Sequence, residues 1–163
     1  MQDILTCAMG LDVHRDIIVA CLVKGAVDAE PEAETRTFST LIPEMQKLRD
    51  WVIESECRNI AMESTGIYWQ PIYEMLESCF DGEISILVVN ARHMKNVPGR
   101  KTDMKDAQWI ATLLRAGLLK GSFIPDKAFR ELRHLTRYRK SVVHDITAQK
   151  KRIDKFLQRS GFR

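Results

Sequence analysis

The fold is decided by two stretches near the N-terminus, CAMGLD at residues 7–12 and IIVACLV at residues 17–23. The first is small and apolar, and the second is rich in β-branched side chains. Apolar runs of this kind, separated by a polar link such as His14–Asp16, predict two antiparallel strands. A third strand is expected over Glu34–Phe38, where side chains alternate in character after the acidic linker Asp28–Glu32.

Helices and strands alternate in the next part of the chain. Helical spacing of apolar residues predicts a helix over 43–55, capped by Ser39 or Thr40, and another over 68–79. Short apolar runs predict strands over 59–62 and 84–89, and the second of these, being uninterrupted, is typical of a central strand covered on both faces. Three strands followed by helix, strand, helix and strand predict an α/β fold with a mixed sheet and flanking helices.

The last third of the chain is predicted to be helical. A basic, irregular segment over 90–101 precedes a helix over 104–114 that Thr102 would cap. A longer helix is expected over 129–157, with a heptad-like seam made of Leu135, Val142, Ile146, Ile153 and Phe156, onto which Arg139 and Gln149 also fall. A long helix with an unused apolar stripe predicts a coiled coil with a second copy of the chain. The alternative is a helix that folds back on its own domain.

Charge is divided unevenly along the 163 residues, which suffice for one ordinary domain and an appendage. Residues 1–91 hold 6 basic and 16 acidic side chains, a net charge of −10, whereas residues 92–163 hold 19 basic and 6 acidic ones, a net charge of +13. This asymmetry predicts a polyanionic partner for the second part, although a solvated basic helix without a partner is the plainer reading.

The sequence also bears on cellular location and on the state of the cysteines. No stretch approaches the roughly 20 uncharged residues of a membrane span, so no membrane partner and a cytoplasmic location are expected. The four cysteines form no metal-binding pattern, which favours reduced structural thiols over a zinc site.

Four acidic residues lie at predicted strand ends or at a predicted helix start, where ligands commonly bind in α/β sheets. Asp12 ends the first strand and Glu63 ends the fourth, while Asp103 and Asp106 are i, i+3 neighbours at the start of a helix. Each alone has an ordinary structural explanation. Together they would repel one another unless cations shared the site, and hard, oxygen-preferring Mg²⁺ or Mn²⁺ suits such a set. Two such ions can assist phosphodiester displacement, which gives these four acids a candidate catalytic role.

Groups suited to phosphate surround the acids in the sequence. The loop before Asp103 is basic, and two hydroxyl residues follow Glu63, so the candidate nucleic-acid contacts are Arg92, Lys95, Arg100, Lys101, Ser64 and Thr65. Such contacts hold the backbone of a nucleic acid and carry no sequence information. A histidine beside a turn, such as His14, is expected to be polar surface.

Three runs carry a family resemblance, namely GLDVH at 10–14, MESTG at 62–66 and VPGRKTDMKDA at 97–107. They resemble, in order, the three motifs of the DEDD transposases of bacterial insertion sequences. This group is related to the pilin-inverting recombinase Piv, and its N-terminal domain is similar to the RuvC Holliday-junction resolvase. The third run is the most specific, because a basic loop, a threonine cap and two acids at i, i+3 seldom coincide.

The resemblance implies an RNase H-like, RuvC-like fold over residues 1–119, with Mg²⁺ held by Asp12, Glu63, Asp103 and Asp106. It implies a basic coiled-coil segment over 120–163 that serves in subunit assembly and nucleic-acid contact. Members of the family act in DNA transposition with a structured guide RNA, and strand exchange needs a serine in a second, C-terminal domain. This sequence stops at Arg163 without that domain.

Three functions therefore remain open. The first is the metal-binding domain of an RNA-guided transposase that binds DNA. The second is a self-sufficient Mg²⁺-dependent junction endonuclease. The third is a nucleic-acid-binding dimerisation module whose acids are inactive.

Overall fold

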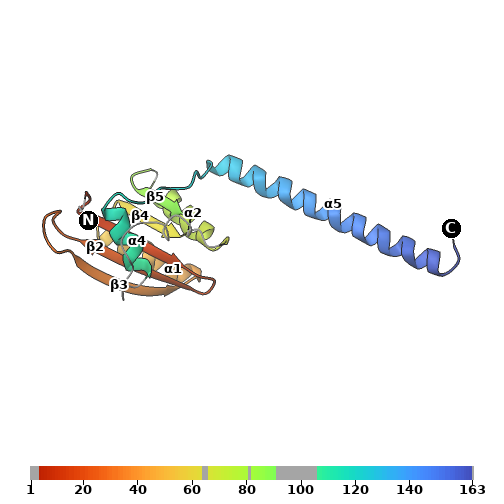
Figure 1. Cartoon of the computed structure of the whole chain (residues 1–163), viewed down its shortest axis with the longest axis horizontal. Coiled ribbons are helices and arrows are strands. Elements are labelled where there is room, and N and C mark those ends of the chain that lie inside the picture. The colour runs from red at the N-terminus through yellow and green to blue at the C-terminus, as the bar shows by residue number, and fades with distance from the viewer. Residues whose placement is uncertain (1–3, 64–65, 81, 91–105, 163) are drawn as a thin grey trace. The chain divides into compact units, whose positions relative to one another are not determined.

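The computed structural model describes residues 4–63, 66–80, 82–90 and 106–162 (Figure 1). The elements follow in the order β1 (Cys7–Val13), β2 (Ile17–Lys24), β3 (Glu32–Ser39), α1 (Ile42–Glu54), β4 (Asn59–Glu63), α2 (Trp69–Phe80), β5 (Ser85–Val89), α4 (Asp106–Arg115) and α5 (Lys127–Arg159). The chain divides into two compact units, Met1–Ser122, which contains the sheet, and Phe123–Arg163, which contains α5. The predicted strands and helices are present, with ends that differ by at most two residues. The start of the helix predicted over 104–114 and its predicted cap, Thr102, lie outside the described residues.

The five strands form one mixed sheet in the order β3-β2-β1-β4-β5. β2 pairs antiparallel with both β1 and β3, to which it is joined by the short connections 14–16 and 25–31. β4 pairs parallel with β1 and with β5, and the crossover from β4 to β5 contains α2. An antiparallel meander continued by parallel strands in this order is the RNase H-like topology, so the expected fold class is confirmed.

β5 is an edge strand, and the prediction of a central strand was wrong. Within the described part of the chain, β4 is the one strand that pairs along β5, and the first residue of β5 is exposed while Val88 and Val89 are buried. The far edge is closed at one end by the segment after α4, where Val89 forms a bridge with Gly121 and Ser122 N–H donates to the Val88 carbonyl at 2.7 Å. The apolar run reflects this cover and the packing of α2 rather than a central position.

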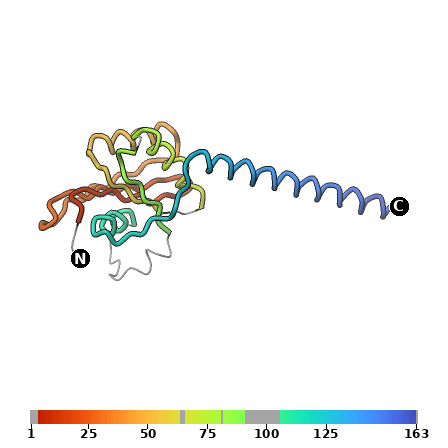
Figure 2. The backbone as a smooth tube through the Cα atoms, turned by 90° about the horizontal axis from the view of Figure 1, so that it is seen from above, coloured from red at the N-terminus to blue at the C-terminus, as the bar shows by residue number. Residues whose placement is uncertain are grey.

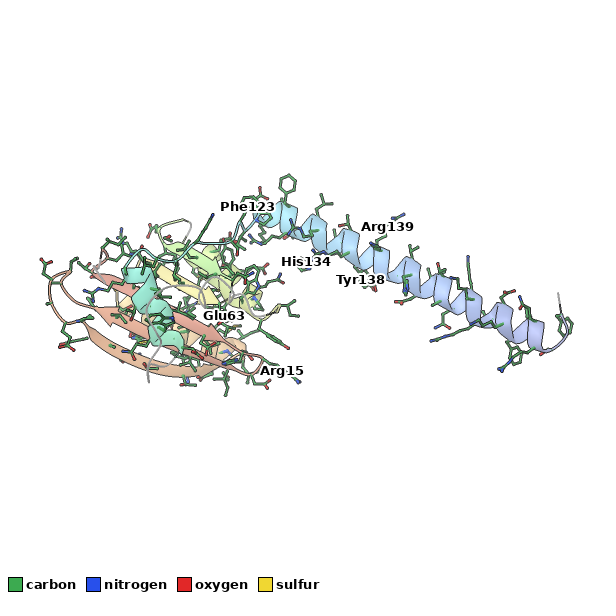
Figure 3. The ribbon with its side chains drawn as sticks, in the orientation of Figure 1. Arg15, Glu63, Phe123, His134, Tyr138 and Arg139 are labelled. Atoms are coloured by element: carbon green, nitrogen blue, oxygen red, sulfur yellow. The ribbon has the colours of Figure 1, made fainter. Side chains whose placement is uncertain are left out.

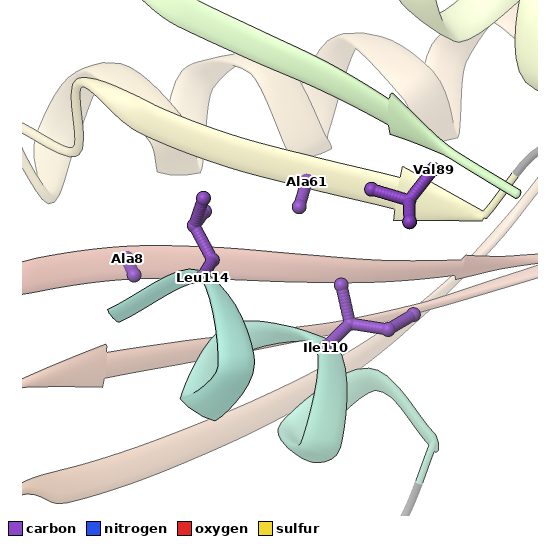
Figure 4. Close-up of a cluster of buried hydrophobic side chains, with 5 residues drawn as sticks. All are labelled: Ala8, Ala61, Val89, Ile110 and Leu114. Atoms are coloured by element: carbon purple, nitrogen blue, oxygen red, sulfur yellow. The ribbon is translucent and has the colours of Figure 1, made fainter. Parts of the chain in front are cut away.

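Helices cover both faces of the sheet. α4 lies on one face and α1 and α2 lie on the other (Figure 2). The α4 face is closed by a cluster of buried side chains to which three strands contribute, as Figure 4 shows, made of Ala8, Ala61, Val89, Ile110 and Leu114. The strand residues between them, such as Leu11 and Met62, are buried on the opposite face, since side chains alternate along a strand.

The start of α1 differs from the prediction. Leu41 is its N-cap and provides no side-chain cap, whereas the Thr40 hydroxyl donates to the Arg15 carbonyl at 2.9 Å. The threonine therefore ties the β3 end to the β1–β2 hairpin, and a proline in the first turn, Pro43, helps to begin the helix instead.

α5 is a helix of 33 residues whose side chains are nearly all exposed within its own unit. Its N-cap is Asp126, whose carboxylate accepts from the Phe129 N–H at 3.0 Å. No helix among the described residues has the length and apolar character needed to cross a bilayer.

Candidate metal centre and nucleic-acid interface

Asp12 and Glu63 lie at the ends of the neighbouring strands β1 and β4, at corresponding positions in the strand register. In the parallel pairing of β1 with β4, Gly10 lies opposite Ala61 and Leu11 lies opposite Met62. One step further along each strand are Asp12 and Glu63. Side chains level with one another on adjacent strands point to the same face, so the register places both carboxylates on one face at the carboxyl ends of β1 and β4.

That face is the one covered by α4. Ala8 lies four residues before Asp12 and Ala61 lies two residues before Glu63, each on the same side of its strand as the acid, and both pack with Ile110 and Leu114 (Figure 4). Gly10 faces the α4 backbone at Ala107 and Ala111. Moving along β1 from Ala8 toward Asp12 therefore follows α4 backward, from its last turn toward its first.

The first turn of α4 carries the third described acid, Asp106. The positive end of the helix dipole lies there. Asp12, Glu63 and Asp106 are therefore gathered toward the same end of the α4–sheet layer. Figure 3 labels Glu63 within the sheet unit.

The three acids differ in burial. Asp12 is 8% exposed, Glu63 is half-buried and Asp106 is exposed. The Asp12 Oδ2 lies 3.1 Å from His14 Nε2, and the His14 side chain is 60% exposed. His14 is exposed, as expected of polar surface, and its ring also contacts the buried carboxylate two residues before it.

The other predicted site residues lie outside the described residues. These are Asp103, Arg92, Lys95, Arg100, Lys101, Ser64 and Thr65. Among the residues that the structure describes, no three His, Cys, Asp or Glu side chains are grouped closely enough to hold a metal ion. The convergence of all four acids, which includes Asp103, stays a prediction. The donors of Asp12, Glu63 and Asp106 are all carboxylate oxygens, a set whose chemistry fits Mg²⁺ or Mn²⁺.

A basic face runs along α5 opposite its apolar seam. At about 100° per residue, the predicted seam around Leu135 and Ile153 occupies one side of the helix. Within about 60° of the opposite direction are exposed basic side chains at six positions, namely Arg133, Arg137, Lys140, Lys151, Lys155 and Arg159. Within α5, which the structure describes throughout, no acidic residue falls in that sector. Figure 3 shows side chains radiating from α5, among them His134, Tyr138 and Arg139.

A thiol pair lies at the opposite end of the same two strands. Hydrogen bonding with Cys57 lowers the pKa of Cys7 to about 7 against the effect of burial, and the positive charges of Lys24 and Arg115 act in the same direction. The same hydrogen bond and burial raise the pKa of Cys57. The two thiols are therefore expected to titrate as a coupled pair, in which Cys7 loses its proton before Cys57.

Comparison with known proteins identifies the family. A profile of IS110-type DEDD transposases, described as transposase, matches residues 9–161. No curated protein matches the sequence. Two solved structures from Thermus thermophilus are similar: RuvC, with 12% identity, covering 71% of this chain and 99% of that one at a TM-score of 0.49, and RuvC in complex with a Holliday junction substrate, with 11% identity, covering 72% and 100% at 0.49.

The strand order β3-β2-β1-β4-β5, with acidic side chains at the ends of β1 and β4 and at the start of α4, is that of an RNase H-like domain. The match to the transposase family covers nearly the whole chain, α5 included. The chain belongs to the IS110-type DEDD transposases.

Proposed function

We propose that this chain is the metal- and nucleic-acid-binding part of a DNA transposase, with residues 1–119 holding Mg²⁺ or Mn²⁺ and residues 120–163 forming a basic coiled coil. The observation that carries the proposal is the register of β1 and β4, in which Leu11 pairs with Met62, because it supports a position for Asp12 and Glu63 one residue further along each strand on the α4 face. Asp106 begins the helix on that face, and Asp103 precedes it by one turn in sequence.

The chain's own groups have distinct parts in this site. Asp12, Glu63, Asp103 and Asp106 supply oxygen ligands, and the first turn of α4 adds a positive potential. His14 holds the Asp12 carboxylate in place through its ring nitrogen. A divalent ion, when bound, stabilises the charge that develops on the phosphodiester oxygens.

Nucleic acid is proposed to contact the basic loop and the basic face of α5. Arg92, Lys95, Arg100 and Lys101, with Ser64 and Thr65, are assigned to the phosphates next to the acids. The basic face of α5 is assigned to a further stretch of DNA or of a structured guide RNA. Because this face lies opposite the seam, pairing of two α5 helices leaves it accessible.

Metal binding by two neutralising variants tests the first part. Asp12→Asn removes one negative charge from the buried end of β1. Asp16→Asn, the control, removes one negative charge from a side chain in the β1–β2 turn that is 80% exposed. Mn²⁺ titration followed by electron paramagnetic resonance should show at least about a tenfold loss of affinity for Asp12→Asn and none for Asp16→Asn. Equal affinities in wild type and both variants would remove Asp12 from the metal site.

Cleavage of labelled branched DNA in the presence of Mn²⁺ distinguishes the alternatives. A chain that binds metal but leaves the DNA intact supports a domain that completes its site with other parts of a transposase. Cutting by the purified chain, lost in Asp12→Asn, would instead make it a self-sufficient junction endonuclease. Failure to bind metal would favour an inactive binding module.

A further inference from the structure

Gly10 lies close against the backbone of α4. A Cβ atom built on it would lie 2.1 Å from the Ala107 carbonyl oxygen, 2.5 Å from the Ala111 nitrogen and 3.0 Å from the Ile110 Cβ. The first two are backbone atoms, which cannot rotate away. Gly10 is an ordinary strand residue, paired with Cys21 on one side and Ala61 on the other. Glycine is therefore needed here for space and not for an unusual backbone conformation.

We propose that Gly10 is a positioning residue of the metal site: its missing side chain sets the distance between α4 and the sheet, and so the distance between the acid of the helix and the acids of the strands. This inference rests on the metal site proposed above.

The positions of these residues follow from the pairing of β1 with β4, in which paired residues that face α4 form a row across the two strands. Gly10 and Ala61 form one row, and both face α4. The next row on that face consists of Asp12 and Glu63. On the helix, Ala107 is the residue that Gly10 touches, and Asp106 comes directly before it. This close contact thus includes the residue that follows the helix acid, and it lies two residues before the acids on the two strands.

A methyl group at position 10 would move this end of α4 most. β1 is hydrogen-bonded to a strand on each side and cannot recede. The other end of α4 is anchored, since the buried Arg115 donates from Nη2 to the Gly25 carbonyl at 3.1 Å and to the Ala26 carbonyl at 2.6 Å. Relieving a 2.1 Å contact to 3.0 Å requires a shift of about 1 Å at Ala107, and ligand positions tolerate only about 0.5 Å.

The test compares two variants that enlarge side chains on the same face. Gly10→Ala acts beside Ala107, whereas Ala8→Val acts one row earlier, beside Leu114 and the anchored end of the helix. Mn²⁺ affinity is measured by electron paramagnetic resonance, and the urea midpoint reports the stability of each variant. Gly10→Ala should lose at least about tenfold in Mn²⁺ affinity. The Mn²⁺ affinity of Ala8→Val should stay within about threefold of that of wild type, even though its urea midpoint is equal to or lower than that of Gly10→Ala.

The outcomes separate this inference from the metal site itself. If Gly10→Ala keeps its Mn²⁺ affinity while Asp12→Asn loses it, the positioning role is wrong and the metal site stands. Equal losses of Mn²⁺ affinity in Gly10→Ala and Ala8→Val would lead to the same conclusion. Unchanged affinity in Asp12→Asn would overturn both. If Gly10→Ala does not fold, Ala61→Val can replace it, because it enlarges the residue paired with Gly10 by a side chain that can rotate. Ala61→Val should also lose at least about tenfold in Mn²⁺ affinity. An unchanged Mn²⁺ affinity would refute the positioning role.

Discussion

The basic face of α5 predicts a specific dependence of nucleic-acid binding on salt. The perturbation is the loss of one positive charge at either of two neighbouring positions, by Arg137→Ala on the basic face or by Arg139→Ala on the seam side. Both side chains are exposed and both variants have the same net charge. They differ only in the direction in which the lost charge pointed, since two residues along a helix are about 200° apart.

The magnitude follows from the number of phosphates that the face can reach. Six exposed basic side chains lie in the sector opposite the seam, along a helix of 33 residues, or about 50 Å. If each neutralises one phosphate, the logarithm of the association constant falls with the logarithm of salt at a slope of about −5. Affinity for a duplex should then fall about a thousandfold between about 50 and 200 mM salt.

Fluorescence anisotropy with a labelled duplex, titrated over a series of KCl concentrations, measures the slope. Arg137→Ala should reduce its magnitude by about 1, and Arg139→Ala should leave it unchanged. Sedimentation at the same protein concentrations controls for a change of oligomeric state. Equal slopes in the two variants, or a wild-type affinity that salt does not weaken, would refute the assignment of nucleic acid to this face.

Three further outcomes are expected. Arg115→Met keeps most of the buried volume but leaves the Gly25 and Ala26 carbonyls without their charged donor, so chemical unfolding should show a loss of about 2–5 kcal/mol. With its pKa near 7, Cys7 should be alkylated by iodoacetamide at a rate that rises through neutral pH and levels off above it, whereas Cys57, whose pKa is raised, should stay unmodified; peptide mass spectrometry distinguishes the two. Ile146→Asp should convert a dimer to a monomer in sedimentation without changing the unfolding of the sheet unit, and a wild-type monomer would contradict the coiled coil.

The sequence alone predicted most of the elements and their order. Apolar runs, β-branched composition and turn residues are local signals, and they are strong where one face of a strand or helix is buried. The hairpin of β1 and β2 and the long helix α5 were predicted for this reason. Asp12, Glu63 and Asp106 were also chosen from sequence, because strand ends and helix starts can be located from these patterns.

Only the tertiary structure decided how these elements meet. The edge position of β5 depends on which strands pair, and an apolar run is the same in a central strand and in an edge strand covered by α2 and by the Gly121 bridge. The contact of Gly10 with the backbone of α4 joins residues about a hundred positions apart, and the pairing of Gly10 with Ala61 sets Asp12 level with Glu63. Such contacts are set by packing between distant segments, where a glycine in a strand gives no local sign of what approaches it.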